Sequence, residues 1–182
     1  NGIFLLRELS ARTKDRIVSY GELLSSQIIA AKLNAVGLVV EWKDAREIIV
    51  TDSGFGKATV DFAASNKKTA AFFGASASSL FVVPGFIAAD KNNVTTTLGR
   101  GGSDYTAAIL AAAVDASVLE IWTDVSGMMT ADPRLVNNIK HIPQISYQEA
   151  MELSHFGAKV IYPPTIQPVM KKGIPVWIKN TF

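Results

Sequence analysis

Cysteine is absent from this chain of 182 residues, and histidine occurs only twice. A chain without cysteine forms no disulfide framework and no thiolate metal site, and two isolated histidines do not build a zinc site by themselves. We therefore expect no metal site of protein ligands, and we expect His141 and His155 to be structural or surface residues. Because redox chemistry sets no constraint, a cytoplasmic location is the default expectation.

Long apolar runs and a strong excess of one charge are missing too. No stretch reaches the length of a membrane span, and the apolar start at residues 1–6 is short and lacks the basic residues of a signal peptide. The net charge is +2, and lysines are adjacent only at Lys67–Lys68 and Lys171–Lys172. We expect neither a membrane nor a nucleic-acid partner. The chain starts without methionine, which suggests a piece of a longer protein.

What remains is the composition of an ordinary globular domain, with 48% hydrophobic and 19% charged residues. Strand and helix patterns alternate, and several strands are apolar throughout, which predicts an α/β domain over residues 1–182 with a mainly parallel sheet covered on both faces. The expected helices lie at about residues 15–35, 59–73, 107–114, 147–154 and 165–172. The expected strands lie at about residues 38–42, 47–50, 80–84, 94–98, 117–124 and 174–179.

The most informative stretch runs from Thr95 to Ala116 and predicts a strand end, a glycine-rich turn and a buried helix. Ser103 is the expected N-cap of that helix. The free N–H groups and the positive dipole at the helix start suit an anion, and Arg100 adds a charge beside them. Glycines at 99, 101 and 102 allow the backbone to approach a ligand closely. The alternative is a plain tight turn in which Asp104 complements the helix dipole.

Two familiar anion sites are excluded by the spacing in this turn. The run G-R-G-G-S-D lacks the third glycine of the dinucleotide fingerprint, and no G-K-[ST] follows, as a P-loop requires.

The helix at 15–35 carries a polar stripe of Ser19, Glu22, Ser25 and Ser26, besides apolar positions at Ile17, Leu24, Ile28 and Ala31. The stripe is either a solvated face or part of a site. Gly21 beside the acid costs about 1 kcal/mol relative to alanine, which is easier to understand if something approaches closely there.

Three segments follow strands and should share one edge of the sheet, where ligands of α/β folds bind. They are the Pro84-Gly85-Phe86 turn, the Arg100 turn, and the loop that begins with Thr123 and Asp124. Further along, Ser146 and Glu149 form the capping-box pattern, and Lys159 stands between small and apolar residues.

Four blocks of the sequence resemble the signatures of aspartokinases, within the amino acid kinase superfamily. They are SYGELLSS, GRGGSDYTAAILAA, TDVSGMMTADPR and SYQEAMELSHFGAKVIYPPTI, and they occur in the order of the family. The last block and the IKNTF ending look most like the kinase part of bifunctional aspartokinase/homoserine dehydrogenases. The resemblance implies the three-layer αβα sandwich of the carbamate kinase-like fold.

The resemblance also implies an activity: ATP-dependent phosphorylation of the side-chain carboxylate of L-aspartate, with Mg²⁺ bridging the phosphates, in lysine, threonine and methionine biosynthesis. The implied substrate-binding residues are Glu22, Phe86, Arg100 and Ser103. Asp104 would orient the reacting groups as the catalytic residue. The implied nucleotide-binding residues are Thr123, Asp124, Arg134 and Lys159. The intact protein is expected to be a homo-oligomer.

The chain departs from the family at two points. Met129 stands where many aspartokinases have tyrosine, and the N-terminal K-F-G-G-T-S block, which holds the principal catalytic lysine, is absent. We therefore expect a partial catalytic domain, without ACT or dehydrogenase domains, that is inactive or nearly so by itself. The alternatives are another amino acid kinase, such as an acetylglutamate or glutamate 5-kinase relative, and a non-catalytic ligand-binding module with the same fold.

Overall fold

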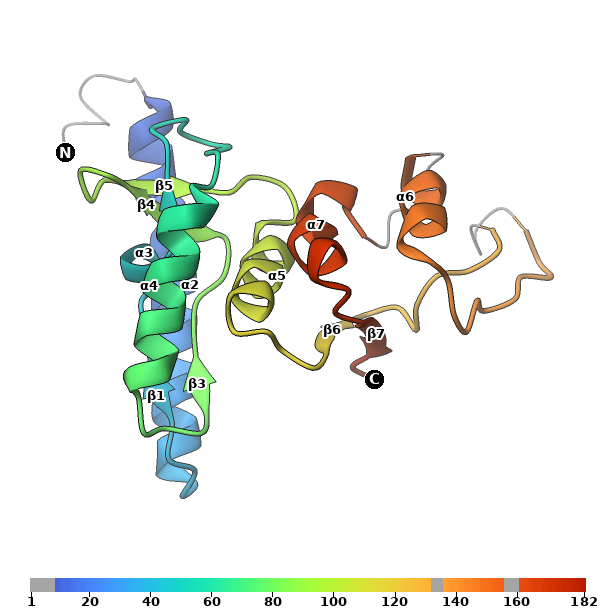
Figure 1. Cartoon of the computed structure of the whole chain (residues 1–182), viewed down its shortest axis with the longest axis horizontal. Coiled ribbons are helices and arrows are strands. Elements are labelled where there is room, and N and C mark those ends of the chain that lie inside the picture. Colours follow the sequence, from blue (N-terminus) through green and yellow to red (C-terminus); the bar gives the residue numbers. More distant parts are fainter. Residues whose placement is uncertain (1–8, 132–135, 156–160) are drawn as a thin grey trace. The chain divides into compact units, whose positions relative to one another are not determined.

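The computed structural model describes residues 9–131, 136–155 and 161–182, and its internal contacts divide the chain into two compact units, residues 1–106 and 107–182 (Figure 1). The single domain expected over 1–182 stays a prediction. The first unit contains, in order, α2 (Ala11–Ala35), β1 (Glu41–Trp42), α3 (Ala45–Ile48), β2 (Val50–Thr51), α4 (Phe62–Ala75), β3 (Phe81–Val82), β4 (Ile87–Asp90), β5 (Thr95–Thr97) and the start of α5 (Gly102–Ala113).

The strands of the first unit form two small groups. β1 pairs with β3 in parallel, and β4 lies between β2, its parallel partner, and β5, its antiparallel partner. The long helix α2 packs against β1, β3 and β5, whereas α4 packs against β2 and α3. The core between them is apolar and closed, with Ile48, Ile49, Ile87 and Ala88 exposed by 2% or less.

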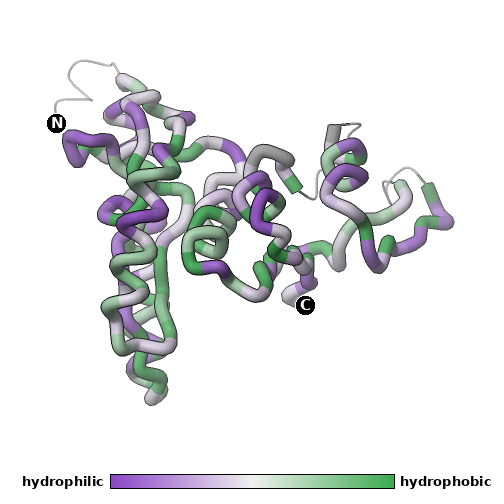
Figure 2. Tube along the Cα trace, viewed as in Figure 1, coloured by the Kyte–Doolittle hydropathy of each residue, from purple (hydrophilic) through white to green (hydrophobic). Residues whose placement is uncertain are grey.

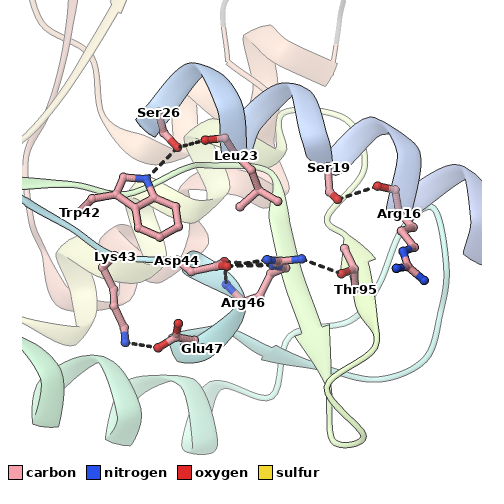
Figure 3. Close-up of polar contacts among 10 residues, drawn as sticks. All are labelled: Arg16, Ser19, Leu23, Ser26, Trp42, Lys43, Asp44, Arg46, Glu47 and Thr95. Carbon is pink, nitrogen blue, oxygen red and sulfur yellow. Dashed lines mark hydrogen bonds and ion pairs between the residues drawn. The ribbon is translucent and has the colours of Figure 1, made fainter. Parts of the chain in front are cut away.

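Helix α2 buries a mainly polar face and leaves several large apolar side chains exposed. Of the apolar positions, Ile17 is 48% exposed, Leu24 59% and Ile28 67%, whereas the buried residues are Asp15, Ser19, Leu23, Ser26 and Ala30. The hydroxyls of that face are satisfied: Ser19 donates to the Arg16 carbonyl at 2.8 Å, and Ser26 accepts the Trp42 indole N–H at 2.9 Å (Figure 3). The interpretation of the polar stripe as a solvated face is therefore wrong for Ser19 and Ser26, which are buried.

Three predicted details differ from the structure. Residues 45–48 form the short helix α3, so Glu47 and Ile48 do not begin the strand predicted over 47–50; the Asp44 carboxylate caps this helix by accepting the Arg46 N–H and binding the Arg46 guanidinium (Figure 3). The buried strand β4 was not predicted, since it directly follows a turn. Helix α5 begins at Gly102, so Ser103 lies in its first turn and not at the N-cap.

The second unit contains the rest of α5, then β6 (Leu119–Thr123), α6 (Tyr147–His155), α7 (Pro163–Lys172) and β7 (Val176–Asn180). β6 and β7 pair in parallel, so three of the four strand pairings in the described ranges are parallel, which confirms a mainly parallel α/β fold. The core of this unit joins Ala108 and Ala111 of α5 to Leu119, Ile166 and Val169. Figure 2 colours most of α5 as hydrophobic, in accord with the predicted buried helix.

The capping box of α6 is confirmed. The Ser146 N–H and hydroxyl both donate to Glu149 Oε2, at 2.9 and 2.6 Å, and the Glu149 N–H donates back to the Ser146 hydroxyl at 3.2 Å. These bonds lower the pKa of Glu149 because they favour its ionised form. None of the helices described is both long and apolar enough to cross a membrane.

Candidate functional site

The Phe86 turn and the Arg100 turn meet at one edge of the first unit, as expected, although the pair that brings them together is antiparallel. Ile87 at the start of β4 pairs with Thr97 at the end of β5, so the turn before β4 and the turn after β5 are neighbours. The Leu98 N–H donates to the Phe86 carbonyl at 2.9 Å, and the Phe86 N–H lies 3.3 Å from the Gly102 carbonyl. The two turns are therefore fixed to each other by backbone hydrogen bonds.

Phe86 has an unusual backbone, with φ at +70°, which is costly for a residue with a bulky side chain. The Thr106 hydroxyl holds it: this buried oxygen accepts the Phe86 N–H at 3.0 Å and donates to the Gly102 carbonyl at 2.9 Å. Glycine is needed on both sides of this contact. A Cβ at Gly85 would lie 2.8 Å from Ser103 Cα, and one at Gly102 would lie 2.7 Å from the Phe86 ring.

A cavity of about 280 Å³ opens beside these turns. Its lining combines one acid from α2, the Phe86 turn and the first turn of α5: Glu22, Phe86, Gly99, Gly101, Gly102, Ser103 and Asp104. Four of the five residues expected around the amino acid and the reacting groups thus line one cavity. The fifth, Arg100, is an exposed residue between two of the lining glycines.

The charges around this cavity are divided between its sides. Glu22 supplies a carboxylate from α2, while the start of α5 supplies backbone N–H groups and the positive end of its dipole. Burial raises the pKa of Asp104, because desolvation disfavours its charged form. This division of charge suits a small zwitterion.

The residues expected at the nucleotide lie in the second unit or outside the described residues. Thr123 ends β6, where its carbonyl accepts the N–H and the hydroxyl of Thr181 at 2.9 and 3.0 Å, and its own hydroxyl donates to Asp124 at 3.1 Å. Thr123 and Asp124 therefore stand at the carboxyl end of a strand, as predicted. Arg134 and Lys159 lie outside the described residues.

The second unit also contains His141 and a larger cavity. His141 Nε2 donates a hydrogen bond to the Ser126 carbonyl at 2.6 Å, and its exposed ring occupies the space where a Cβ on Gly127 would lie, which agrees with the structural or surface role expected for it. The side chain of His155 lies outside the described part. A larger cavity of about 800 Å³ has a mostly apolar lining that includes Tyr147, Ile161 and Trp177, but not Thr123 or Asp124.

Within residues 9–131, 136–155 and 161–182 there is no group of three or more histidine, aspartate or glutamate side chains placed to hold a metal ion.

Sequence reasoning missed Asp15, whose carboxylate joins α2 to the end of β5, just before the Arg100 turn, and to the loop at Gly56. It accepts the N–H groups of Gly56 and Thr97 at 2.8 and 3.1 Å and the Thr97 hydroxyl at 2.9 Å. The signal in the sequence is weak, because an acid near the start of a helix is normally explained by the helix dipole. Only the position of Thr97, 82 residues later, reveals the contact.

Comparison with known proteins identifies relatives that are named as aspartokinases, alone or joined to a homoserine dehydrogenase. The chain is 40% identical over 181 residues to bifunctional aspartokinase/homoserine dehydrogenase 1 of Arabidopsis thaliana, which covers 99% of this chain and 20% of the relative. It is 42% identical over 168 residues to lysine-sensitive aspartokinase 3 of Escherichia coli, covering 92% of this chain and 37% of the relative. The chain thus spans between a fifth and about two fifths of the length of these relatives.

Solved structures show the same likeness. The structure of E. coli aspartokinase III in complex with aspartate and ADP superposes with a TM-score of 0.87 at 42% identity, over 94% of this chain and 38% of that one. Aspartate kinase of Clostridium acetobutylicum gives a TM-score of 0.80 at 42% identity, over 92% of this chain and 36% of that one. The fold is that of these kinases, a mixed α/β fold with mainly parallel strands.

The sequence profile of the amino acid kinase family matches residues 5–180, which is nearly the whole chain. The order of elements, the parallel strands and the cavity at the glycine-rich turn agree with that match. The chain belongs to the amino acid kinase family.

Proposed function

We propose that this chain is the catalytic part of an aspartate kinase, which transfers the γ-phosphoryl group of ATP to the side-chain carboxylate of L-aspartate. The observation that carries the proposal is the cavity in which Glu22, Phe86, Ser103 and Asp104 meet the glycine-rich turn of Arg100. Relatives of this chain are aspartokinases, and one solved relative is described with aspartate and ADP bound.

The cavity residues divide the work of holding the amino acid. Glu22 pairs with the ammonium group, and the planar guanidinium of Arg100 pairs with a carboxylate, as its bidentate geometry favours. Ser103 and the N–H groups at the start of α5 donate to the same anionic end. The Phe86 ring closes one wall, and its position is fixed by Thr106. Together these groups fix which carboxylate of the substrate faces the nucleotide.

Phosphoryl transfer needs little covalent chemistry from the protein, because most of the rate enhancement comes from positioning and charge neutralisation. An oxygen of the aspartate side chain attacks the γ-phosphorus, the bond to the bridging oxygen breaks, and ADP leaves. Asp104 orients the reacting groups. We assign Thr123, Asp124, Arg134 and Lys159 to the nucleotide, on the basis of the family resemblance. Mg²⁺ bound with the nucleotide would neutralise part of the charge on the phosphates.

The test is acyl phosphate formation by the full-length gene product. With ATP, Mg²⁺ and a panel of amino acids, hydroxylamine converts any acyl phosphate into a hydroxamate that absorbs visible light with ferric ion. We expect a hydroxamate with L-aspartate and none with N-acetyl-L-glutamate. A product only with N-acetyl-L-glutamate or L-glutamate would assign the chain to another amino acid kinase, and no product with any of them would favour a ligand-binding module.

A further inference from the structure

Asp15 is a buried acid, and aspartate side chains are rarely buried in proteins. Its side chain is 2% exposed, near the start of α2, and it accepts hydrogen bonds from three donors. A buried carboxylate is costly unless its oxygens are fully used. Here one oxygen accepts two backbone N–H groups and the other accepts a hydroxyl. The carboxylate thus makes three hydrogen bonds, which link α2 to Gly56 and to Thr97.

The three donors come from two segments that surround the glycine-rich turn. Thr97 gives two of them and is two residues before Gly99, while Gly56 gives the third from the loop before Ala58. That loop also touches the turn directly. The Ala58 N–H donates to the Thr97 carbonyl at 2.8 Å, and a Cβ at Gly99 would lie 3.2 Å from the Gly56 carbonyl oxygen.

Helix α2 carries Glu22 seven residues after Asp15. Seven residues are two turns, so the two acids lie on the same side of the helix, about 10 Å apart along its axis. Beyond Glu22, Ser26 ties the same side to β1 through Trp42 (Figure 3). Glu22 therefore lies between two residues of α2 that hydrogen-bond to other elements. Ser26 bonds to β1, and Asp15 bonds to Thr97 at the end of β5, the strand that leads to the cavity.

We propose that Asp15 is a positioning residue of the amino-acid cavity: it fixes the distance between Glu22 on α2 and the turn from Gly99 to Ser103. The inference rests on the proposed function for the identity of the ligand. Without the carboxylate, α2 and the end of β5 are no longer joined by a direct polar contact in this region. The ammonium site and the carboxylate site then lose their fixed separation, and an amino acid that must reach both binds more weakly.

The test uses matched variants of the full-length gene product. In Asp15→Asn the amide oxygen can accept both N–H groups while the NH₂ donates to the Thr97 hydroxyl, so all three contacts survive without the charge. Asp15→Ala removes all three. Ser19→Ala, one turn further on the same buried face, removes only a bond within the helix and is the control for lost burial.

We expect Asp15→Ala to raise the KM for L-aspartate about tenfold or more, since small misplacements at a site cost this much, with the KM for ATP changed by less than about twofold. Asp15→Asn and Ser19→Ala should stay within about threefold of the unchanged protein in both constants. Equal KM values for aspartate in Asp15→Ala and the unchanged protein would overturn the inference, as would a loss in kcat alone.

Two additional measurements keep the result decisive. If Asp15→Ala does not fold, Thr97→Val removes one donor with little change of shape, and we expect a smaller rise in the KM for aspartate; no rise would refute the inference. Amide hydrogen exchange at Gly56 and Thr97 should be faster in Asp15→Ala than in Ser19→Ala, with or without ligand. A native protein that turns over no aspartate would instead refute the proposed function, and unchanged exchange at these amides would refute the role of Asp15.

Discussion

At the scale of single residues, the cavity is shaped by backbone that only particular side chains permit. Phe86 is held with a positive φ, and Gly85 and Gly102 leave no room for a Cβ where the two turns touch. The sequence predicts the turn and the aromatic residue, since Pro84-Gly85 is a turn signal. It does not predict that Thr106 would hold Phe86 in place, because that bond joins residues 20 positions apart.

Asp104 gives a pH-dependent prediction at this scale. Burial raises its pKa above the ordinary 3.8, so the folded state binds its proton more tightly than the unfolded state does. The resulting cost to stability is absent below pH 3.8, grows as the pH rises through 3.8 to the folded pKa, and is fully present above both. Asp104→Asn should therefore have a higher melting temperature than the unchanged protein at neutral pH.

The check is thermal unfolding of both proteins across the acid range. The difference in melting temperature should shrink as the pH falls toward 3.8. A difference that stays constant with pH, or that favours the unchanged protein at neutral pH, would contradict a desolvated carboxyl at this position.

At the scale of elements, α2 shows where sequence patterns mislead. The apolar spacing of Ile17, Leu24 and Ile28 predicts a helix correctly, yet these side chains are exposed and the polar side is buried. A pattern reports periodicity but not which face packs, and here hydrogen bonds at Asp15, Ser19 and Ser26 make the polar face suitable for burial. The same competition explains α3, where the capping carboxylate of Asp44 outweighs strand propensity.

Gly21 in α2 yields a prediction for the whole element. It is an exposed glycine in mid-helix, and a Cβ there would meet nothing within 4 Å among the described residues. Gly21→Ala should stabilise the protein by about 0.5–1 kcal/mol, because alanine has less backbone freedom to lose on folding. Denaturant unfolding of Gly21→Ala measures this. Gly74→Ala, an equally open glycine in the last turn of α4, is the matched control and should give a smaller gain.

A lower stability in Gly21→Ala would show that this position is constrained after all. A gain in stability together with weaker aspartate binding would support the close approach that the sequence suggests beside Glu22.

At the scale of the whole molecule, the sequence predicts the family and the mainly parallel α/β fold well, because four signature blocks are spread along the chain in the order of the family. It also predicts which residues of the first unit gather at one cavity, since Glu22, Ser103 and Asp104 come from signature blocks and Phe86 from a turn signal after a strand. The contacts that hold the cavity together, at Asp15 and Thr106, depend on tertiary geometry and were not predicted. The assignment of Thr123, Asp124, Arg134 and Lys159 to the nucleotide stays a prediction.

The central claim is that the turn around Arg100 binds the carboxylate of aspartate, and calorimetric titration of L-aspartate into the protein tests it most directly. Arg100→Ala is compared with Arg12→Ala, which removes an exposed arginine of α2 that does not line the cavity. We predict that Arg100→Ala weakens binding at least about tenfold, equivalent to about 1.4 kcal/mol, whereas Arg12→Ala leaves the affinity within about twofold. Equal affinities in Arg100→Ala and the unchanged protein would contradict the account.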